Sequence, residues 1–122
     1  MPWVYNSANG VLSHEGRLIG VGYSGHDEGV NNPLVNNLHG IGPIPCGIWS
    51  IGDPVEHPQL GPLAFPLMPQ ENTETYGRSG FFIHGDSLEH PGAEQASHGC
   101  IVMPRNIRLA ILNSSDRVLE VV

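Results

Sequence analysis

The chain has 122 residues, with five Arg, no Lys and twelve Asp or Glu, which gives a formal net charge of −7. This acidity argues against nucleic acid as a partner, because phosphate binding needs a basic face. No stretch approaches 18 apolar residues, which argues against a membrane-spanning helix, and the N-terminus lacks the basic start and apolar core of a signal peptide.

Glycine and proline are frequent, at 16 and 11 residues. Both interrupt regular helices, so the composition favours many short strands joined by turns. A chain of this length suits one domain with a modest core. We therefore predict a single, mainly β domain over residues 1–122, with one short helix in its C-terminal half.

The first elements form a predicted β-meander. Residues 3–6 and 11–13 flank a turn that ends in Asn9-Gly10, a strong hairpin signal. Residues 17–23 follow as a third strand, because their side chains alternate along the chain.

Residues 24–40 are polar and rich in turn-forming residues, so we expect a long loop with one helical turn near 34–38. The loop also holds four residues of metal-ligating types: His26, Asp27, Glu28 and His39. They lack the close paired spacing of a zinc site, and we interpret them as solvated loop residues.

The middle of the chain alternates strands and loops. Residues 47–53 form a predicted strand, and the prolines within 54–62 indicate a loop. Residues 63–68 are expected at a sheet edge, because Pro66 cannot donate a ladder hydrogen bond. Residues 70–80 then form a polar loop.

Two short apolar runs, 81–83 and 101–102, are predicted buried strands. His84 follows the first run and Cys100 precedes the second. If the two strands lie side by side, His84 and Cys100 emerge at the same end of the sheet. An imidazole beside a thiol can accept its proton or stabilise the thiolate, so this pair indicates a cysteine nucleophile with its base.

The C-terminal part completes the predicted fold. Residues 86–96 are expected to form a loop that covers the site, and 117–122 a closing strand. A helix over 105–113 begins after Pro104, which suits a first helical turn. Its expected core-facing residues are Ile107, Ala110 and Ile111, with Arg105 and Arg108 outward.

The two cysteines permit one disulfide, between Cys46 and Cys100. A bonded Cys100 could not act as a nucleophile, so we expect the disulfide to be absent. Cys46 is interpreted as a small buried residue at a strand entry.

Two ordered motifs resemble one family. His84-Gly85, followed by Ser97-His98-Gly99-Cys100-Ile101, is similar to the signature of L,D-transpeptidase (YkuD-type) catalytic domains: a His-Gly pair, a variable loop, then Ser/Thr-His-Gly-Cys and an apolar residue. The segment 42–51 resembles the family's Pro-x-Gly-x-aromatic-x-Ile strand entry. The resemblance runs from about residue 40 to the C-terminus. It implies a β-sandwich or barrel-like sheet.

The resemblance also implies a role for each motif residue. Cys100 attacks a peptidoglycan stem peptide at the third residue, and His84 is the base that then protonates the leaving terminal D-alanine. The Gly85 carbonyl orients the His84 ring, and the main-chain amides of His98, Gly99 and Cys100 form an oxyanion hole. Water as acceptor makes the enzyme an L,D-carboxypeptidase; an amine makes it an L,D-transpeptidase or a D-amino-acid exchange enzyme. No metal or cofactor is implied.

One position departs from the family pattern: many members carry Arg two residues after the Cys, where this chain has Val102. The residues expected to contact substrate are Arg78, Tyr76, Ser97 and Asp86. The planar guanidinium of Arg78 suits a carboxylate, but an ordinary surface arginine is an equally good interpretation.

Two other functions remain open. His84, His98 and Cys100 are of types that bind zinc, which would make the chain a zinc hydrolase. The same fold without chemistry would be a cell-wall-binding module.

The compact chain is most similar to the small L,D-transpeptidase-like effectors delivered by type VI secretion. Without a signal peptide, we expect synthesis in the cytoplasm and action in the periplasm. The expected partners are peptidoglycan stem peptides, a cognate immunity protein and the secretion machinery.

Overall fold

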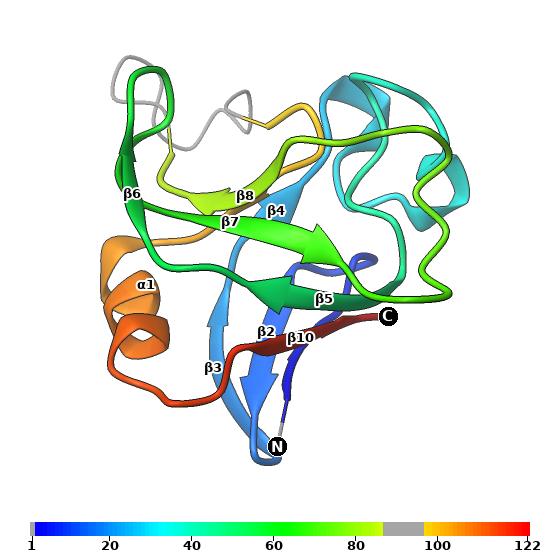
Figure 1. Ribbon diagram of the computed structural model, residues 1–122. Coiled ribbons are helices and arrows are strands. Elements are labelled where there is room, and N and C mark those ends of the chain that lie inside the picture. The colour runs from blue at the N-terminus through cyan, green and yellow to red at the C-terminus, as the bar shows by residue number, and fades with distance from the viewer. Residues whose placement is uncertain (1, 87–96) are drawn as a thin grey trace.

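The computed structural model describes residues 2–86 and 97–122. Ten strands, two short 3₁₀ turns and one α-helix make up this part of the chain (Figure 1). In chain order they are β1 (Trp3–Tyr5), β2 (Val11–His14), β3 (Arg17–Val21), β4 (Tyr23–Ser24), η1 (Asp27–Gly29), η2 (Pro33–Val35), β5 (Gly47–Ile51), β6 (Val55–His57), β7 (Gly61–Pro69), β8 (Phe81–His84), β9 (Ile101–Val102), α1 (Arg105–Leu112) and β10 (Val118–Val121).

The strands form one highly curved, nearly closed sheet. Its order is β3-β2-β1-β10-β5-β7-β8-β9-β4, and β6 pairs with β7 outside this path. The two ends of the sheet, β3 and β4, are separated in the chain only by Gly22, so the chain itself joins them. A Cβ on Gly22 would overlap the carbonyl oxygen of Val102. Glycine therefore permits the close approach that closes the sheet, and the mainly β, barrel-like fold is confirmed.

The interior of this sheet is aromatic and aliphatic. Trp49 is fully buried and meets Phe81 edge to face, with ring centroids 5.2 Å apart, a preferred aromatic geometry. The indole N–H of Trp49 donates to the carbonyl of Pro45 at 3.1 Å, so its polar group is satisfied. The other buried core side chains include Trp3, Tyr5, Leu12, Ile44, Ile51, Phe65, Leu67, Ile83, Ile101, Met103, Ile107, Ile111, Leu119 and Val121.

Strand β7 differs from the expected edge strand. It spans nine residues and lies between β5 and β8, although it contains Pro66. The carbonyl of Pro66 accepts the N–H of Gly52 at 2.8 Å, just beyond the end of β5. Because the N and O of a strand residue face the same side, the missing proline N–H falls where pairing with β5 stops.

Two other expected elements also differ. Residues 55–57, expected within a loop, form β6 and pair with β7 despite the flanking prolines. The predicted strand 17–23 is divided at Gly22 into β3 and β4. The meander of β1, β2 and β3 is confirmed, with antiparallel pairing on both sides of β2.

Helix α1 packs beside β3, where a Cβ on Gly20 would lie 2.7 Å from the side chain of Ile107 (Figure 1). The expectation for Arg108 was wrong. It is 8% exposed, and its guanidinium donates to the carbonyls of Met103, Pro62 and Leu63 at 2.9–3.2 Å. These bonds satisfy a buried cation and tie α1 to the start of β7. Ala110, expected toward the core, is exposed.

Candidate active site

His84 ends β8 and Cys100 immediately precedes the neighbouring strand β9, as the two apolar runs predict. Strands β8 and β9 pair in parallel, with Ile83 beside Ile101 and His84 beside Val102. Cys100 precedes β9 by one residue and is thus two positions from the partner of His84. Side chains two positions apart share a face of a sheet, so both groups point to the same side.

The register corrects one detail of the expectation. His84 ends β8, whereas Cys100 precedes β9, so they do not leave the sheet at the same end. Strand spacing and rise place their Cα atoms roughly 8 Å apart along a diagonal of the face. Phe82 lies level with Cys100, and its main-chain N–H points at the thiol.

The Cys100 thiol is held by main-chain groups at a pocket. Its Sγ accepts the N–H of Phe82 at 3.3 Å and donates toward the carbonyl of Gly80 at 3.7 Å. Burial raises the pKa of Cys100, while the Phe82 N–H and the positive charge of Arg78 act in the opposite direction. The thiol is therefore protonated at neutral pH and needs a base before it can attack.

The pocket at Cys100 has a volume of about 320 Å³. Three basic or imidazole side chains line it, and no acidic residue is among its described lining. The lining residues are His39, Gly40, Gly77, Arg78, Ser79, Gly80, Phe81, His98 and Cys100. In a chain of net charge −7, this pocket suits an anionic ligand.

His84 is oriented by its neighbour, as the resemblance implies. Its Nδ1 lies 2.7 Å from the carbonyl oxygen of Gly85, so this nitrogen carries the proton and donates. The lone pair is then on Nε2, which is fully buried and has no hydrogen-bond partner among the described residues. Burial lowers the pKa of His84, which keeps the ring neutral and able to accept a proton.

The Ser97–Cys100 turn is braced from inside the protein. Ser97 is fully buried, and its Oγ donates to the Cys100 carbonyl at 2.5 Å while accepting the N–H groups of Gly25 and Gly99, both at 3.0 Å. A hydroxyl with these three bonds is saturated, so Ser97 holds the turn and does not face substrate. The Gly99 amide is likewise occupied, which removes it from the expected oxyanion donors.

A second serine, Ser24, which was not predicted from the sequence, also holds this turn. The Oγ of Ser24 donates to the Gly99 carbonyl and accepts the N–H of Ile44, each at 2.8 Å, and its side chain is fully buried. It comes from β4, far from the Cys100 motif in sequence. A single serine at a strand end carries no signal by which it could have been found.

The other predicted site residues differ in whether they line the pocket. His98 is exposed, lines the pocket and lies 3.3 Å through Nδ1 from the Gly40 carbonyl. Tyr76 is 45% exposed and is outside the pocket lining. Asp86 accepts the Tyr23 hydroxyl at 2.9 Å and is also outside the lining. The expected covering loop falls on 87–96, outside the described residues.

Of the two interpretations of Arg78, that of an ordinary surface arginine was wrong. Arg78 lines the pocket but is only 7% exposed, so it is not a surface arginine. Its guanidinium donates to four main-chain carbonyls. A clamp on a substrate carboxylate would have to displace these bonds.

Both cysteines are free, as expected. The interpretation of Cys46 as a buried residue was wrong, because its side chain is exposed beside Ser7, with Sγ 3.8 Å from the Ser7 hydroxyl.

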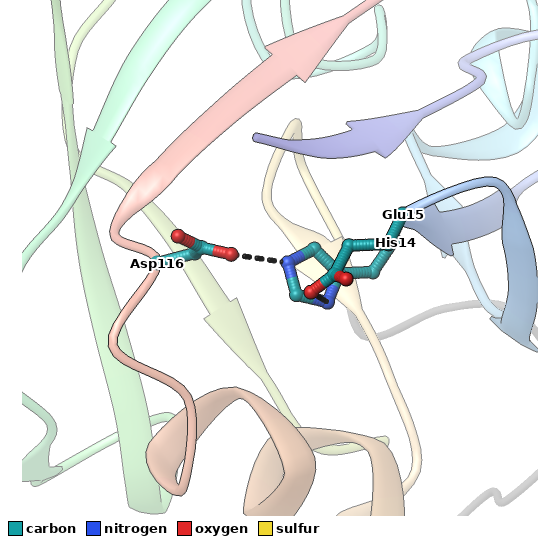
Figure 2. A group of neighbouring side chains, drawn as sticks. All are labelled: His14, Glu15 and Asp116. Carbon is teal, nitrogen blue, oxygen red and sulfur yellow. Dashed lines mark hydrogen bonds and ion pairs between the residues drawn. The ribbon is translucent and has the colours of Figure 1, made fainter. Parts of the chain in front are cut away.

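A group of metal-ligating types occurs in the described part of the chain, but away from Cys100. It comprises His14, Glu15 and Asp116 (Figure 2). Asp116 lies 2.6 Å from Nε2 of His14, and Glu15 lies 3.8 Å from Nδ1. The carboxylates thus face different ring nitrogens, an ion-pair arrangement. His84, His98 and Cys100 form no such group, which disfavours the zinc alternative.

The fold has a counterpart among solved structures. A crystal structure of an Enterococcus faecium L,D-transpeptidase, a Cys-to-Ser mutant, superposes with a TM-score of 0.61 at 14% identity. The match covers 99% of this chain and 49% of that protein, so this chain spans about half its length. The architecture is therefore of the L,D-transpeptidase type.

The sequence places the chain within a particular family. The model of the Tlde1 domain family matches residues 20–122, and the chain belongs to this family. This result confirms the kind of family that the two motifs indicated. No curated protein matches the chain in sequence. Within the described residues, no helix is both long and apolar enough to cross a membrane.

Proposed function

We propose that this protein is a cysteine-dependent enzyme that acts on peptidoglycan stem peptides through an acyl-enzyme on Cys100. One observation carries the proposal: the thiol opens on a pocket, and on the same sheet face a neutral, buried imidazole offers an Nε2 that has no hydrogen-bond partner among the described residues. Buried polar atoms are rarely left unpaired, and those that are often belong to catalytic sites. Membership of the Tlde1 domain family supports the same substrate.

The proposed reaction begins with proton transfer from the Cys100 thiol to Nε2 of His84. The thiolate attacks the carbonyl carbon of the third stem residue, and the bond to the terminal D-alanine nitrogen breaks. His84 returns the proton to that nitrogen, which leaves as the amine, and a thioester remains on Cys100. Water or an amine then takes the acyl group, which restores the thiol.

The charges around the thiol favour this order of events. Burial raises the pKa of Cys100 and lowers that of His84, so the resting pair is neutral. The ion pair forms only when substrate is attacked. His39 and His98 in the pocket lining can donate hydrogen bonds to the carboxylates of a stem peptide, and the nearby charge of Arg78 favours an anion there.

The test is incubation of purified protein with tetrapeptide muropeptides, with and without a free D-amino acid, followed by mass spectrometry. Loss of one alanine indicates carboxypeptidase activity, and a changed terminal residue indicates exchange. Cys100→Ala and His84→Gln are expected to lose at least a hundredfold in rate. Folded wild-type protein that leaves every muropeptide unchanged would overturn the proposal.

We further infer that the protein is an antibacterial effector that acts in the periplasm of a target cell, with an immunity protein in the producing cell. The inference rests on membership of the Tlde1 domain family and on the resemblance of the two sequence motifs to the small effectors delivered by type VI secretion. Expression directed to the periplasm of a test bacterium should lyse or deform cells, whereas cytoplasmic expression should not. Equal toxicity of Cys100→Ala in the periplasm would favour a wall-binding module instead.

A further inference from the structure

Arg78 is a buried cation at the edge of the candidate active site. It lies in the connection between β7 and β8 and is 7% exposed. Among the residues the structure describes, no carboxylate lies within ion-pair distance of it. Burying an arginine without a counter-charge is costly, so the position calls for an explanation.

The guanidinium satisfies its donors with main-chain oxygens from two separate segments. Nη1 donates to the carbonyls of Asn36 and Pro43 at 2.5 and 2.8 Å. Nη2 donates to the carbonyl of Gly42 at 2.8 Å and to that of His98 at 3.3 Å. Figure 1 shows the cyan segment that carries residues 36–43 close to the light-green connection between β7 and β8.

These contacts fix the turn that presents the thiol. A Cβ on Gly99 would lie 2.5 Å from Nη2 of Arg78 and 2.9 Å from Cε1 of Phe81, so residue 99 has no room for a side chain. The Phe81 ring in turn lies 5.1 Å from the guanidinium carbon. Arg78 is therefore wedged between the 36–43 segment, Phe81 and the turn that leads to Cys100.

We propose that Arg78 is a positioning residue of the active site, which joins the 36–43 segment to the Cys100 turn and supplies the positive charge that stabilises the thiolate when it forms. The inference rests on the proposed role of Cys100 as nucleophile. Among residues 2–86 and 97–122, the other titratable groups that face the thiol are His39 and His98 in the pocket lining and His84 on the same sheet face. The proposal is consistent with the downward effect of Arg78 on the pKa of Cys100.

Two substitutions separate the two parts of this role. Arg78→Gln removes the charge and most of the donors, whereas Arg78→Lys keeps the charge but loses the planar fork. Arg105→Gln is the matched control, because Arg105 is exposed at the start of α1. All variants carry Cys46→Ser, since Cys46 is free and exposed and would otherwise react.

The first readout is the rate of Cys100 alkylation by iodoacetamide as a function of pH, which needs no substrate. In Arg78→Gln the midpoint of the rate–pH profile should rise by about one pH unit, because the thiolate loses a nearby positive charge. Alkylation at pH 7 should then slow about tenfold. Arg78→Lys and Arg105→Gln should keep the parental midpoint. An unchanged midpoint in folded Arg78→Gln would overturn the charge part of the proposal.

The second readout is turnover of tetrapeptide muropeptides. Arg78→Lys should lose at least tenfold in kcat with little change in KM, because the turn is no longer held; parental kcat in this variant would overturn the positioning part. If Arg78→Gln does not fold, the test rests on Arg78→Lys. This variant should keep the parental midpoint of the alkylation profile and have a reduced kcat. If the parent itself has no turnover, the proposed function fails, and the alkylation profile still decides the role of the charge.

Discussion

Gly99→Ala should be among the most damaging small substitutions in this protein. The φ of Gly99 is +136°, a conformation that residues with a side chain rarely adopt. Holding alanine there costs about 1–3 kcal/mol. The added methyl would also meet Nη2 of Arg78 at 2.5 Å. The end of an arginine normally moves aside, but four hydrogen bonds hold this one, so overpacking adds about 1–3 kcal/mol.

The sum, about 2–6 kcal/mol, is a large part of the roughly 5–15 kcal/mol that stabilises a typical domain. Urea unfolding followed by tryptophan fluorescence measures it. The matched control is Gly16→Ala, where φ is +77° and no atom lies within 4 Å of the added Cβ, so only a backbone cost of about 1–2 kcal/mol applies. If the two variants differ by less than 0.5 kcal/mol (about the error of such a measurement), the fixed position of Arg78 is refuted.

Three further predictions concern other groups. Alkylation of Cys100 in the Cys46→Ser background should have its midpoint above pH 9, because burial raises the pKa of the thiol above its ordinary value of 9.0; a midpoint near 7 would mean a preformed thiolate. Ser24→Ala should lower the free energy of unfolding by about 2–4 kcal/mol, because it leaves two buried main-chain groups without partners, and a change below 1 kcal/mol would contradict this. The hydrogen bond from His14 holds the pKa of Asp116 below its ordinary value of 3.8, so the pair stabilises the fold above that pH and loses its effect as pH falls through the lowered pKa. The Tm of Asp116→Asn should therefore be below wild type at pH 7, with the difference vanishing at acid pH; a difference independent of pH would argue against the pair.

Local signals predicted the part of the site that depends on strand ends. Short β-branched and aromatic runs predicted two buried strands next to His84 and Cys100, and β8 and β9 are indeed adjacent. The contact between Nδ1 of His84 and the Gly85 carbonyl was implied by the family resemblance of the His-Gly pair and not by a local signal. Asn9-Gly10 marked the turn between β1 and β2.

Roles that depend on contacts between distant segments of the chain could not be predicted. The sequence around Arg78 is that of an ordinary polar loop. Only the folded chain brings the 36–43 segment and His98 to its guanidinium. Arg108 was expected outward because helical periodicity counts an arginine as polar, whereas the carbonyls at the start of β7 satisfy it in the interior. Pro66 was expected at an edge because the pattern does not show where the neighbouring strand stops.

The direct test of the central claim is detection of the acyl-enzyme. Protein carrying Cys46→Ser is mixed with tetrapeptide muropeptide, quenched in acid and measured as intact mass. We predict a transient adduct on Cys100 with the mass of the substrate minus alanine. It should be released by hydroxylamine and be absent from the Cys100→Ala variant. Turnover without any adduct, turnover that persists in Cys100→Ala, or activity abolished by EDTA would contradict the claim.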